Sequence, residues 1–403
     1  MKVLQINATY GIGSTGVITK ELSEICYKNG IKPYAAFSKG HANIDEFIDY
    51  YEIGSWLDHK IHAICSRIAG KQGYYSKCAT KKFIKFISSI TPDVVHLHNL
   101  HSNYIHLPTL LQYLASNNIP TVITMHDCWF YTGGCFHYTL AGCEKWKNYC
   151  GKCTKQKLDT PAYFYDASSQ ILDDRIRLFS SFKNLVFVGA SKWISGQISE
   201  SRLRTFGMIE CIYNGFDINV YKPRNTELRN ILGLTNKFLI LGPASKWLLP
   251  INKPALEYFS KHLSDDAVLL LFGYNGKSLK LPKNVILYGF THDRDAMAEL
   301  YSAADVLVNC SWEDTLSSLN LEAQACGTPV VTYESTGSKE TVDGICGFAV
   351  KTGDFEELYA TVEYVKNLGK LSLSSACRDF ILTNFDKYTN YLKYINLYKQ
   401  IVR

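Results

Sequence analysis

Two acidic residues in the C-terminal half, Asp314 and Glu322, lie eight positions apart. A short polar stretch follows the first, and the second falls at the start of a segment with the pattern of an amphipathic helix. A carboxylate is a strong acceptor for hydrogen bonds from hydroxyl groups. Free N–H groups and the dipole at a helix start favour a negative phosphate. Acids and amides at such a junction can therefore share one ligand that carries hydroxyls and a diphosphate.

Histidines follow two apolar segments of the N-terminal half. His96 and His98 alternate, so they share one face of a predicted strand, and Asn99 comes next. His126 follows the next apolar segment along the chain. A histidine at a strand end is usually a structural residue, but ligands of open parallel sheets bind at the carboxyl ends of the strands. These positions are therefore candidate binding residues.

Five of the 13 cysteines crowd between Cys128 and Cys153. Cys150 and Cys153 have the two-residue spacing of zinc ligands, and Cys135 and Cys143 could complete a four-thiolate site. Such a structural zinc would stabilise a long loop that has little core of its own, and it would not be catalytic because all four positions would be closed. Free thiols packed among aromatic residues, or disulfides formed on isolation, are the competing interpretations.

The elements that must position these residues are strands alternating with helices. The opening strand runs into a glycine-rich turn, 11–16, and then into a helical pattern, which leaves backbone amides free at a helix start. Short Val-, Ile- and Leu-rich segments separated by helix-length stretches indicate parallel sheets covered on both faces. Nine such strands are predicted, at 3–7, 93–97, 120–124, 185–188, 238–241, 268–272, 285–288, 306–308 and 329–332. Their number exceeds one ordinary sheet, so two α/β domains are expected.

Length and composition agree with that organisation. A chain of 403 residues, 46% hydrophobic and 20% charged, has material for two cores and excludes disordered, collagen-like and coiled-coil classes. No apolar run is long enough to span a membrane, and the N-terminus lacks the apolar segment of a signal peptide, so a cytoplasmic location is expected. The net charge of +6 is too mild for a nucleic-acid binder.

The charge excess is confined to the N-terminal part. Residues 1–188 carry 20 basic and 14 acidic side chains, whereas residues 189–403 carry 23 of each. The segment 59–92 contains seven Lys and Arg residues and no acidic one. Within it, Phe83, Phe86, Ile87 and Ile90 recur at helical spacing, as in a basic amphipathic helix. This helix either packs on its own domain or contacts anionic lipid head groups or a lipid-linked phosphate.

The stretch from Ser311 to Val331 strongly resembles the signature of retaining glycosyltransferases of family 4, in which two acids flank seven residues and a Cys-Gly-Thr-Pro-Val-Val strand entry follows. The resemblance extends over nearly the whole chain. It includes Asn214-Gly215-Phe216-Asp217, Ser302-Ala303-Ala304-Asp305-Val306 and Thr336-Gly337-Ser338-Lys339-Glu340. It implies a GT-B fold, in which two doubly wound Rossmann-like domains face each other across a cleft.

The resemblance also implies roles for single residues. Asp314 would lie near the donor sugar, and Glu322 would accept hydrogen bonds from the ribose. Most members have Glu at the first position, and Glu313 could partly compensate for the shorter Asp. His126 matches an active-site histidine close to the transferred sugar. The remaining donor-side candidates are Thr315, Leu316, Ser317, Ser318 and Asn214, and the acceptor-side candidates are Gly13, Ser14, Thr15, Gly16, His98 and Asn99.

Cations for the diphosphate are expected after the first strand of the second domain. Lys246 and Lys253 are the candidates, although Pro254 replaces the family's glycine after the second lysine and the spacing is stretched. An ordinary surface lysine is the alternative interpretation of each. Together with His126 and Asp314, these lysines complete the predicted catalytic set.

The expected domains are an acceptor-side domain over 1–188, a nucleotide-sugar-binding domain over 189–385 and a C-terminal helix over 386–403 that returns to the first domain. The implied activity is that of a hexosyltransferase. It would transfer a sugar from a nucleotide-diphosphate sugar to a glycan or lipid-linked acceptor with retention of configuration, in capsule, O-antigen or exopolysaccharide synthesis. No cofactor would be required for catalysis, and segment 59–92 could contact the inner face of the cell membrane. A GT-B sugar-nucleotide epimerase and a catalytically lapsed sugar-binding scaffold remain the alternatives.

Overall fold

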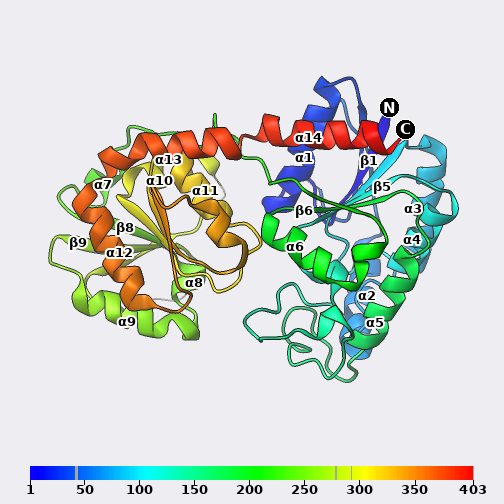
Figure 1. Cartoon of the computed structure of the whole chain (residues 1–403), viewed down its shortest axis with the longest axis horizontal. Helices are drawn as coiled ribbons and strands as arrows, with labels where there is room; N and C mark the ends of the chain where they lie inside the picture. The colour runs from blue at the N-terminus through cyan, green and yellow to red at the C-terminus, as the bar shows by residue number, and fades with distance from the viewer. Residues whose placement is uncertain (41–43, 277–278, 292, 403) are drawn as a thin grey trace. The chain divides into compact units, whose positions relative to one another are not determined.

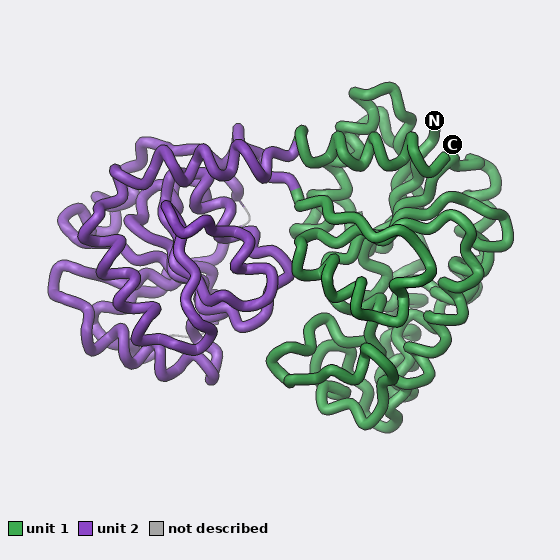
Figure 2. Tube along the Cα trace, in the orientation of Figure 1, with its two compact units in different colours: residues 1–214, 388–403 green, residues 215–387 purple. Residues whose placement is uncertain are grey.

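The computed structural model describes residues 1–40, 44–276, 279–291 and 293–402. The chain forms two compact units, which are coloured separately in Figure 2. Unit 1 comprises Met1–Asn214 together with Tyr388–Arg403, and unit 2 comprises Gly215–Lys387. Each unit is an α/β domain built on one parallel sheet, as the alternation of apolar strands and helices predicts.

Unit 1 is built on a seven-stranded sheet in the order β3-β2-β1-β4-β5-β6-β7, with every neighbouring pair parallel. Its strands are β1 (Lys2–Ile6), β2 (Lys32–Phe37), β3 (Asp49–Glu52), β4 (Val94–Leu97), β5 (Thr121–Met125), β6 (Leu185–Gly189) and β7 (Met208–Cys211). Its helices are α1 (Gly13–Lys28), α2 (Trp56–Ala69), α3 (Lys77–Ile90), α4 (Leu107–Ser116), α5 (Ser168–Phe179), α6 (Lys192–Glu200) and α14 (Lys387–Ile401), with short 3-10 turns at Trp129–Tyr131, Lys145–Lys147 and Arg202–Thr205.

Two buried clusters cover the two faces of this sheet. One includes apolar residues of α3, α4, α5 and α6, and the other includes those of α1 and α14 (Figure 1). The helix α14 packs through tyrosines: the Tyr398 hydroxyl lies 2.6 Å from His96 Nδ1, and the Tyr394 hydroxyl lies 2.8 Å from Thr124 Oγ1. The last helix of the chain thus completes the first unit.

Unit 2 is built on a six-stranded parallel sheet in the order β10-β9-β8-β11-β12-β13. Its strands are β8 (Phe238–Pro243), β9 (Ala267–Tyr274), β10 (Val285–Gly289), β11 (Val306–Asn309), β12 (Val330–Tyr333) and β13 (Gly347–Val350). Its helices are α7 (Leu228–Ile231), α8 (Ala244–Trp247), α9 (Lys253–His262), α10 (Arg294–Ala303), α11 (Ser318–Ala325), α12 (Phe355–Leu368) and α13 (Lys370–Asn384), with 3-10 turns at Pro250–Asn252 and Thr336–Thr341.

The boundary between the units differs from the expected one after residue 188. Residues 189–214 belong to unit 1 because β7 pairs with β6, Val186 lying opposite Met208, and α6 packs on both strands. The nine expected strands are all present, within one or two residues at their ends. Four further strands, β2, β3, β7 and β13, escaped prediction because their sequences are short, polar or interrupted by Pro33.

The expected basic amphipathic helix is α3, and it packs on its own domain. Phe83 and Ile87 are fully buried, and Phe86 and Ile90 lie partly buried against the same core. Its lysines Lys81, Lys82 and Lys85 remain exposed. No described helix combines the length and the hydropathy that crossing a membrane requires.

Candidate functional site

Two histidines of unit 1, His98 and His126, form a hydrogen-bonded row with Gln5 at the carboxyl ends of β1, β4 and β5. Gln5 Nε2 donates to Ser23 Oγ at 2.7 Å, so Gln5 Oε1 faces His98 and accepts from His98 Nε2 at 3.1 Å. His98 Nδ1 lies 3.1 Å from His126 Nε2. Because a neutral imidazole has one donor and one acceptor, His98 Nδ1 must accept and His126 Nε2 must donate. The row therefore fixes the tautomer of His126.

This tautomer leaves His126 Nδ1 as a lone-pair acceptor. The atom is buried and has no hydrogen-bond partner among the described residues. Burial lowers the pKa of His126 to about 4, against the opposing effect of Asp127, and burial also holds the pKa of His98 well below its usual value. Both rings are thus neutral near pH 7, and His126 Nδ1 can accept a hydrogen bond from a hydroxyl group.

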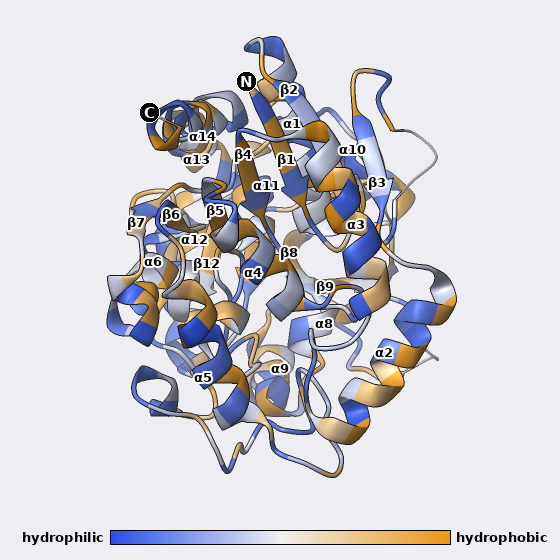
Figure 3. Cartoon of the chain, turned by 90° about the vertical axis from the view of Figure 1, so that its right-hand side faces the viewer, coloured by the Kyte–Doolittle hydropathy of each residue, from blue (hydrophilic) through white to orange (hydrophobic). Residues whose placement is uncertain are grey.

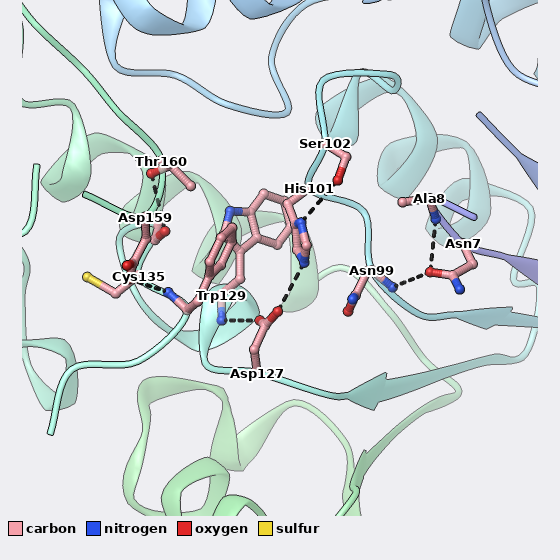
Figure 4. Close-up of polar contacts among 12 residues, drawn as sticks. Asn7, Ala8, Asn99, His101, Ser102, Asp127, Trp129, Cys135, Asp159 and Thr160 are labelled. Atoms are coloured by element: carbon pink, nitrogen blue, oxygen red, sulfur yellow. Dashed lines mark hydrogen bonds and ion pairs between the residues drawn. The ribbon is translucent and has the colours of Figure 1, made fainter. Parts of the chain in front are cut away.

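His98 itself is fully buried, and both of its ring nitrogens are engaged. It was expected among the acceptor-side contacts, but its place in the row makes it a positioning residue for His126. Asn99 follows His98, two residues beyond the end of β4, and is partly buried. Its N–H donates to Asn7 Oδ1 at 3.2 Å, which also accepts from Ala8 N–H at 2.9 Å (Figure 4).

Asp127, the residue after His126, forms a carboxylate–histidine pair with His101 that was not predicted from the sequence. Its Oδ2 lies 3.0 Å from His101 Nε2, and its Oδ1 accepts from the Trp129 N–H at 2.8 Å (Figure 4). Burial alone would raise the pKa of Asp127, but His101 and the Trp129 N–H lower it below its usual value. The sequence feature that could have predicted this pair is the dipeptide His126-Asp127 at a strand end, together with His101 three residues beyond His98.

The glycine-rich turn places the start of α1 at the same sheet edge. Gly11 and Gly13 have φ of 70° and 64°, which favour glycine. Gly16 is buried where a Cβ would lie 2.7 Å from Thr9 Oγ1. Among the described residues no side chain caps the helix start, so Ser14 and Thr15 lie in a first turn whose amides can face an anion.

In unit 2 the loop from β11 to α11 carries Asp314, the first acid of the pair, and α11 carries Glu322. The loop backbone is fixed by 3-10 turn 336–341, because Asp314 N–H donates to Thr336 Oγ1 at 2.8 Å and Gly337 N–H donates to the Asp314 carbonyl at 2.9 Å. Asn309 Nδ2 donates to Ser317 Oγ at 2.9 Å from the end of β11. Glu313 and Asp314 lie in this fixed loop, partly buried.

The start of α11 offers several hydrogen-bonding groups. Ser317 occupies the N-cap without a side-chain capping bond, and Ser318 begins the helix after the buried Leu316. The hydroxyl of Thr315 is buried and has no partner among the described residues. The first-turn amides and this hydroxyl can therefore bind an anionic oxygen.

Glu322, one turn further along α11, lies in an aromatic environment. The Tyr301 hydroxyl donates to Glu322 Oε2 at 2.8 Å, and the Arg294 guanidinium lies over Tyr221 at 5.4 Å from the ring centroid. Burial raises the pKa of Glu322 to about 7, although Tyr301, Arg294 and Tyr221 each act to lower it. Tyr221, Arg294 and Tyr301 were not predicted from the sequence.

The two lysines have different surroundings. Asn252 Nδ2 donates to the carbonyls of Lys246 and Cys310, at 2.9 and 3.0 Å, so Lys246 lies beside the segment that precedes the acidic loop. Lys253 begins α9, with its side chain 74% exposed and 3.8 Å from Glu257. Asn214 is the last residue of unit 1 and lies outside the loop.

The four cysteines of the proposed zinc site line one cavity of about 190 Å³ together with Tyr138 and Trp146. Across the described ranges, however, no three His, Cys, Asp or Glu side chains are arranged to hold one ion. The cavity brings Cys135, Cys143, Cys150 and Cys153 together without a converged ligand set. Arg175 fixes the start of this loop, because its guanidinium donates to the carbonyls of Trp129 and Thr132.

The architecture is that of a GT-B glycosyltransferase. Sucrose-phosphate synthase from Thermosynechococcus elongatus has the same fold over 99% of this chain and 98% of its own, with a TM-score of 0.71 and 15% identity. Alr3699/HepE from Anabaena, solved with UDP-glucose, matches over 99% of this chain and 100% of its own, with a TM-score of 0.65 and 16% identity.

Sequence comparison indicates which family of glycosyltransferases this chain resembles. Residues 246–366 match the family model described as "Glycosyl transferases group 1". A D-inositol 3-phosphate glycosyltransferase from Mycobacterium sp. (strain KMS) is 25% identical over 190 residues, which are 43% of this chain and 43% of the relative. The match thus spans less than half the length of that relative. These matches support a family 4 glycosyltransferase, which is the family that the motifs resemble.

Proposed function

We propose that the protein is a retaining hexosyltransferase that moves a sugar from a nucleotide-diphosphate donor to a hydroxyl of a glycan or lipid-linked acceptor. The observation that carries this proposal is that the family match over residues 246–366 contains Asp314, Glu322 and the loop between them. UDP-sugars are the first donors to test, because the Anabaena neighbour was solved with UDP-glucose.

In this proposal the ribose hydroxyls donate to Glu322, and the diphosphate lies against the first turn of α11 with Lys246 as the nearer cation. Preorganised amides and a lysine stabilise the negative charge that develops on the leaving diphosphate, so no bound divalent metal is needed. Asp314 lies near the donor sugar, and His126 Nδ1 accepts from one of its hydroxyls. By family analogy the leaving phosphate assists deprotonation of the acceptor.

The acceptor is proposed to be lipid-linked, as in capsule, O-antigen or exopolysaccharide assembly, with the protein on the inner face of the cell membrane. The support for this proposal is the exposed cationic surface of segment 59–92, which suits an anionic partner.

Release of free nucleoside diphosphate from a panel of nucleotide sugars, with and without lipid-linked acceptors, tests the function. We expect acceptor-dependent release that falls to near background in Glu322→Ala and His126→Ala. Glu299→Ala removes an exposed carboxylate of the neighbouring helix α10 and serves as the matched control. Near-normal rates in both site variants would reject the site assignment.

A sugar-binding scaffold is the second candidate, because Lys253 is exposed beside Glu257 and the first acid is the shorter Asp. Donor binding is measured by thermal shift, since a ligand of the native state raises its stability. Binding without turnover against every acceptor would favour the scaffold, and acceptor-dependent release would exclude it.

A further inference from the structure

Helix α2 turns its apolar side chains outward. Leu57, Ile61, Ile64 and Ile68 recur at spacings of four, three and four residues, so they form one stripe along the helix. Their exposed fractions are 59, 52, 57 and 46%. Trp56 at the helix start is 72% exposed. Single exposed apolar residues are ordinary, but a contiguous stripe marks an interaction site.

The opposite side of α2, which faces the domain, is polar. His62 is fully buried, with Nδ1 2.8 Å from Ser76 Oγ and Nε2 accepting from the Gly73 N–H at 3.2 Å. Ser66 Oγ donates to Asn103 Oδ1 at 3.0 Å. The helix thus turns polar side chains toward the domain and apolar ones toward solvent, the reverse of an ordinary surface helix. Figure 3 colours several residues of α2 as strongly hydrophobic.

Both ends of α2 are fixed, so the helix cannot roll to bury its stripe. Ser55 and Asp58 form a capping box at the N-terminus. Gly70 ends the helix in the left-handed conformation, with φ of 69°, and its N–H donates to the Ser66 carbonyl. Rolling the helix would break the caps and the hydrogen bonds of His62 and Ser66.

A neighbouring loop extends the exposed apolar area. The Tyr163 N–H donates to the Arg67 carbonyl at 2.8 Å, which ties the loop to the last turn of α2. Tyr163, Phe164 and Tyr165 are 55, 72 and 65% exposed. We call the combined area the α2 surface, made up of Trp56, Leu57, Ile61, Ile64, Ile68, Tyr163, Phe164 and Tyr165.

Cations predominate around the α2 surface, although Asp58 of α2 and Asp166 beside Tyr165 are acidic. Lys60 and Arg67 are exposed on the helix itself, and Lys60 Nζ lies 5.4 Å from the centroid of the Trp56 ring. Lys82 of α3 is close enough to act on the carboxylate of Asp58. Segment 59–92 contributes seven cations and no acid. A second copy of this surface would bring like charges together, whereas an anionic bilayer would attract them.

We propose that the α2 surface binds an anionic lipid bilayer, with the apolar stripe of α2 in the interface and the surrounding Lys and Arg side chains on the head groups. Tryptophan and tyrosine are the side chains that favour the membrane–water boundary. This helix, rather than α3, is the lipid-binding element because the apolar face of α3 is buried. This proposal rests on the proposed function and extends it. Vesicle binding is measured without sugar transfer, so membrane binding and the transferase activity can each be rejected independently.

Flotation with vesicles of phosphatidylglycerol and phosphatidylcholine, compared with phosphatidylcholine alone, measures the binding. We expect the wild type to float with the anionic vesicles. Ile61→Ser combined with Ile64→Ser should lower the partition coefficient at least tenfold, because it removes two large apolar side chains from the interface. The matched control is Ile231→Ser with Leu371→Ser, which changes two exposed apolar residues of unit 2 and should bind like the wild type.

Lys60→Gln combined with Arg67→Gln should weaken binding to anionic vesicles by about fivefold for each charge removed. Quenching of tryptophan fluorescence by brominated lipid should fall in Trp56→Phe, because Trp129, Trp146 and Trp247 are buried and Trp193 and Trp312, which are partly buried, lie outside the α2 surface. Unchanged melting and unchanged nucleotide-induced thermal shifts show that each variant is folded. Wild-type flotation by the Ile61→Ser, Ile64→Ser variant would overturn the proposal. The proposal would also be overturned if the wild type formed a dimer and did not bind vesicles, and if the Ile61→Ser, Ile64→Ser variant were monomeric.

Discussion

Replacing Glu322 by Gln should stabilise unit 2 at alkaline pH while it weakens donor binding. The carboxyl lies beside Tyr301 and Tyr221, and burial raises its pKa to about 7 from an ordinary value of 4.5. The native state therefore retains a proton that the unfolded state has lost. Glutamine keeps the shape and can still accept from the Tyr301 hydroxyl, but it carries no charge to desolvate.

The magnitude follows from the shift. One pKa unit corresponds to about 1.36 kcal/mol, so the rise to about 7 costs the wild type at most about 3 kcal/mol once the pH exceeds 7. A group with a raised native pKa contributes its full stability below the unfolded value and loses it as the pH rises through the native value. The advantage of Glu322→Gln should therefore be small near pH 4.5 and complete above pH 7.

Calorimetry of the whole protein between about pH 5 and pH 8.5 measures this difference. At roughly 2–4 °C per kcal/mol for a unit of this size, the unit 2 transition of Glu322→Gln should lie up to about 10 °C above that of the wild type at the alkaline end. Glu299→Gln, on the exposed side of α10, is the control and should show no such trend. A difference between wild type and Glu322→Gln that does not change with pH would refute the reasoning.

The same variant should bind nucleoside diphosphates about tenfold more weakly than the wild type above pH 7, because a charge-assisted hydrogen bond is replaced by a neutral one. Thermal shifts with a panel of nucleoside diphosphates measure this loss. Equal affinity in the two proteins would remove Glu322 from the proposed donor site without affecting the stability argument.

Three further predictions concern unit 1. Gln5→Leu removes the acceptor of His98 Nε2 and so releases the tautomer of His126; we expect kcat to fall about tenfold with donor affinity unchanged, whereas an unchanged kcat would show that the row has no positioning role. Arg175→Met removes the buried guanidinium that donates to the carbonyls of Trp129 and Thr132 and should cost about 3 kcal/mol in urea unfolding, with the exposed Arg177→Met as control; a cost equal to that of the control would contradict this account. For the cysteine loop, the zinc hypothesis requires the four thiolates to converge on the ion when it binds; metal analysis of protein purified under reducing conditions should then find one zinc per chain that Cys150→Ser removes, and a zinc-free, fully stable protein would end the hypothesis.

Much of the fold could be predicted because buried parallel strands are continuous apolar runs. The missed strands are those where that rule fails: β3 reads Asp-Tyr-Tyr-Glu at a sheet edge, and β7 exposes Met208 at the other. Residues 189–214 belong to the first unit because β7 pairs with β6, and no local sequence pattern predicts that pairing.

The candidate site could be predicted where one segment supplies several residues, as between Asp314 and Glu322. Contacts between segments that are distant in the sequence could not be predicted. The acceptor of His98 comes from β1, and the donor to Glu322 comes from α10. The outward face of α2 was also missed, because periodicity predicts an apolar stripe but not which side of the helix the domain covers.

The packing of α14 on the first sheet has a consequence for folding during synthesis. His96 and Thr124 receive their tyrosine partners from the last helix, and the apolar residues of α14 belong to the core beside α1. At ribosomal rates of 5–20 residues per second, roughly 10–40 s separate the synthesis of Asn214 from that of Ile401. Throughout that interval α1 alone covers its part of this face, the part that α14 covers stays open, and unit 2 emerges as one continuous segment. Unit 1 is thus completed only after unit 2 has been made, and the nascent chain must keep the open part of that face from aggregating until α14 is made.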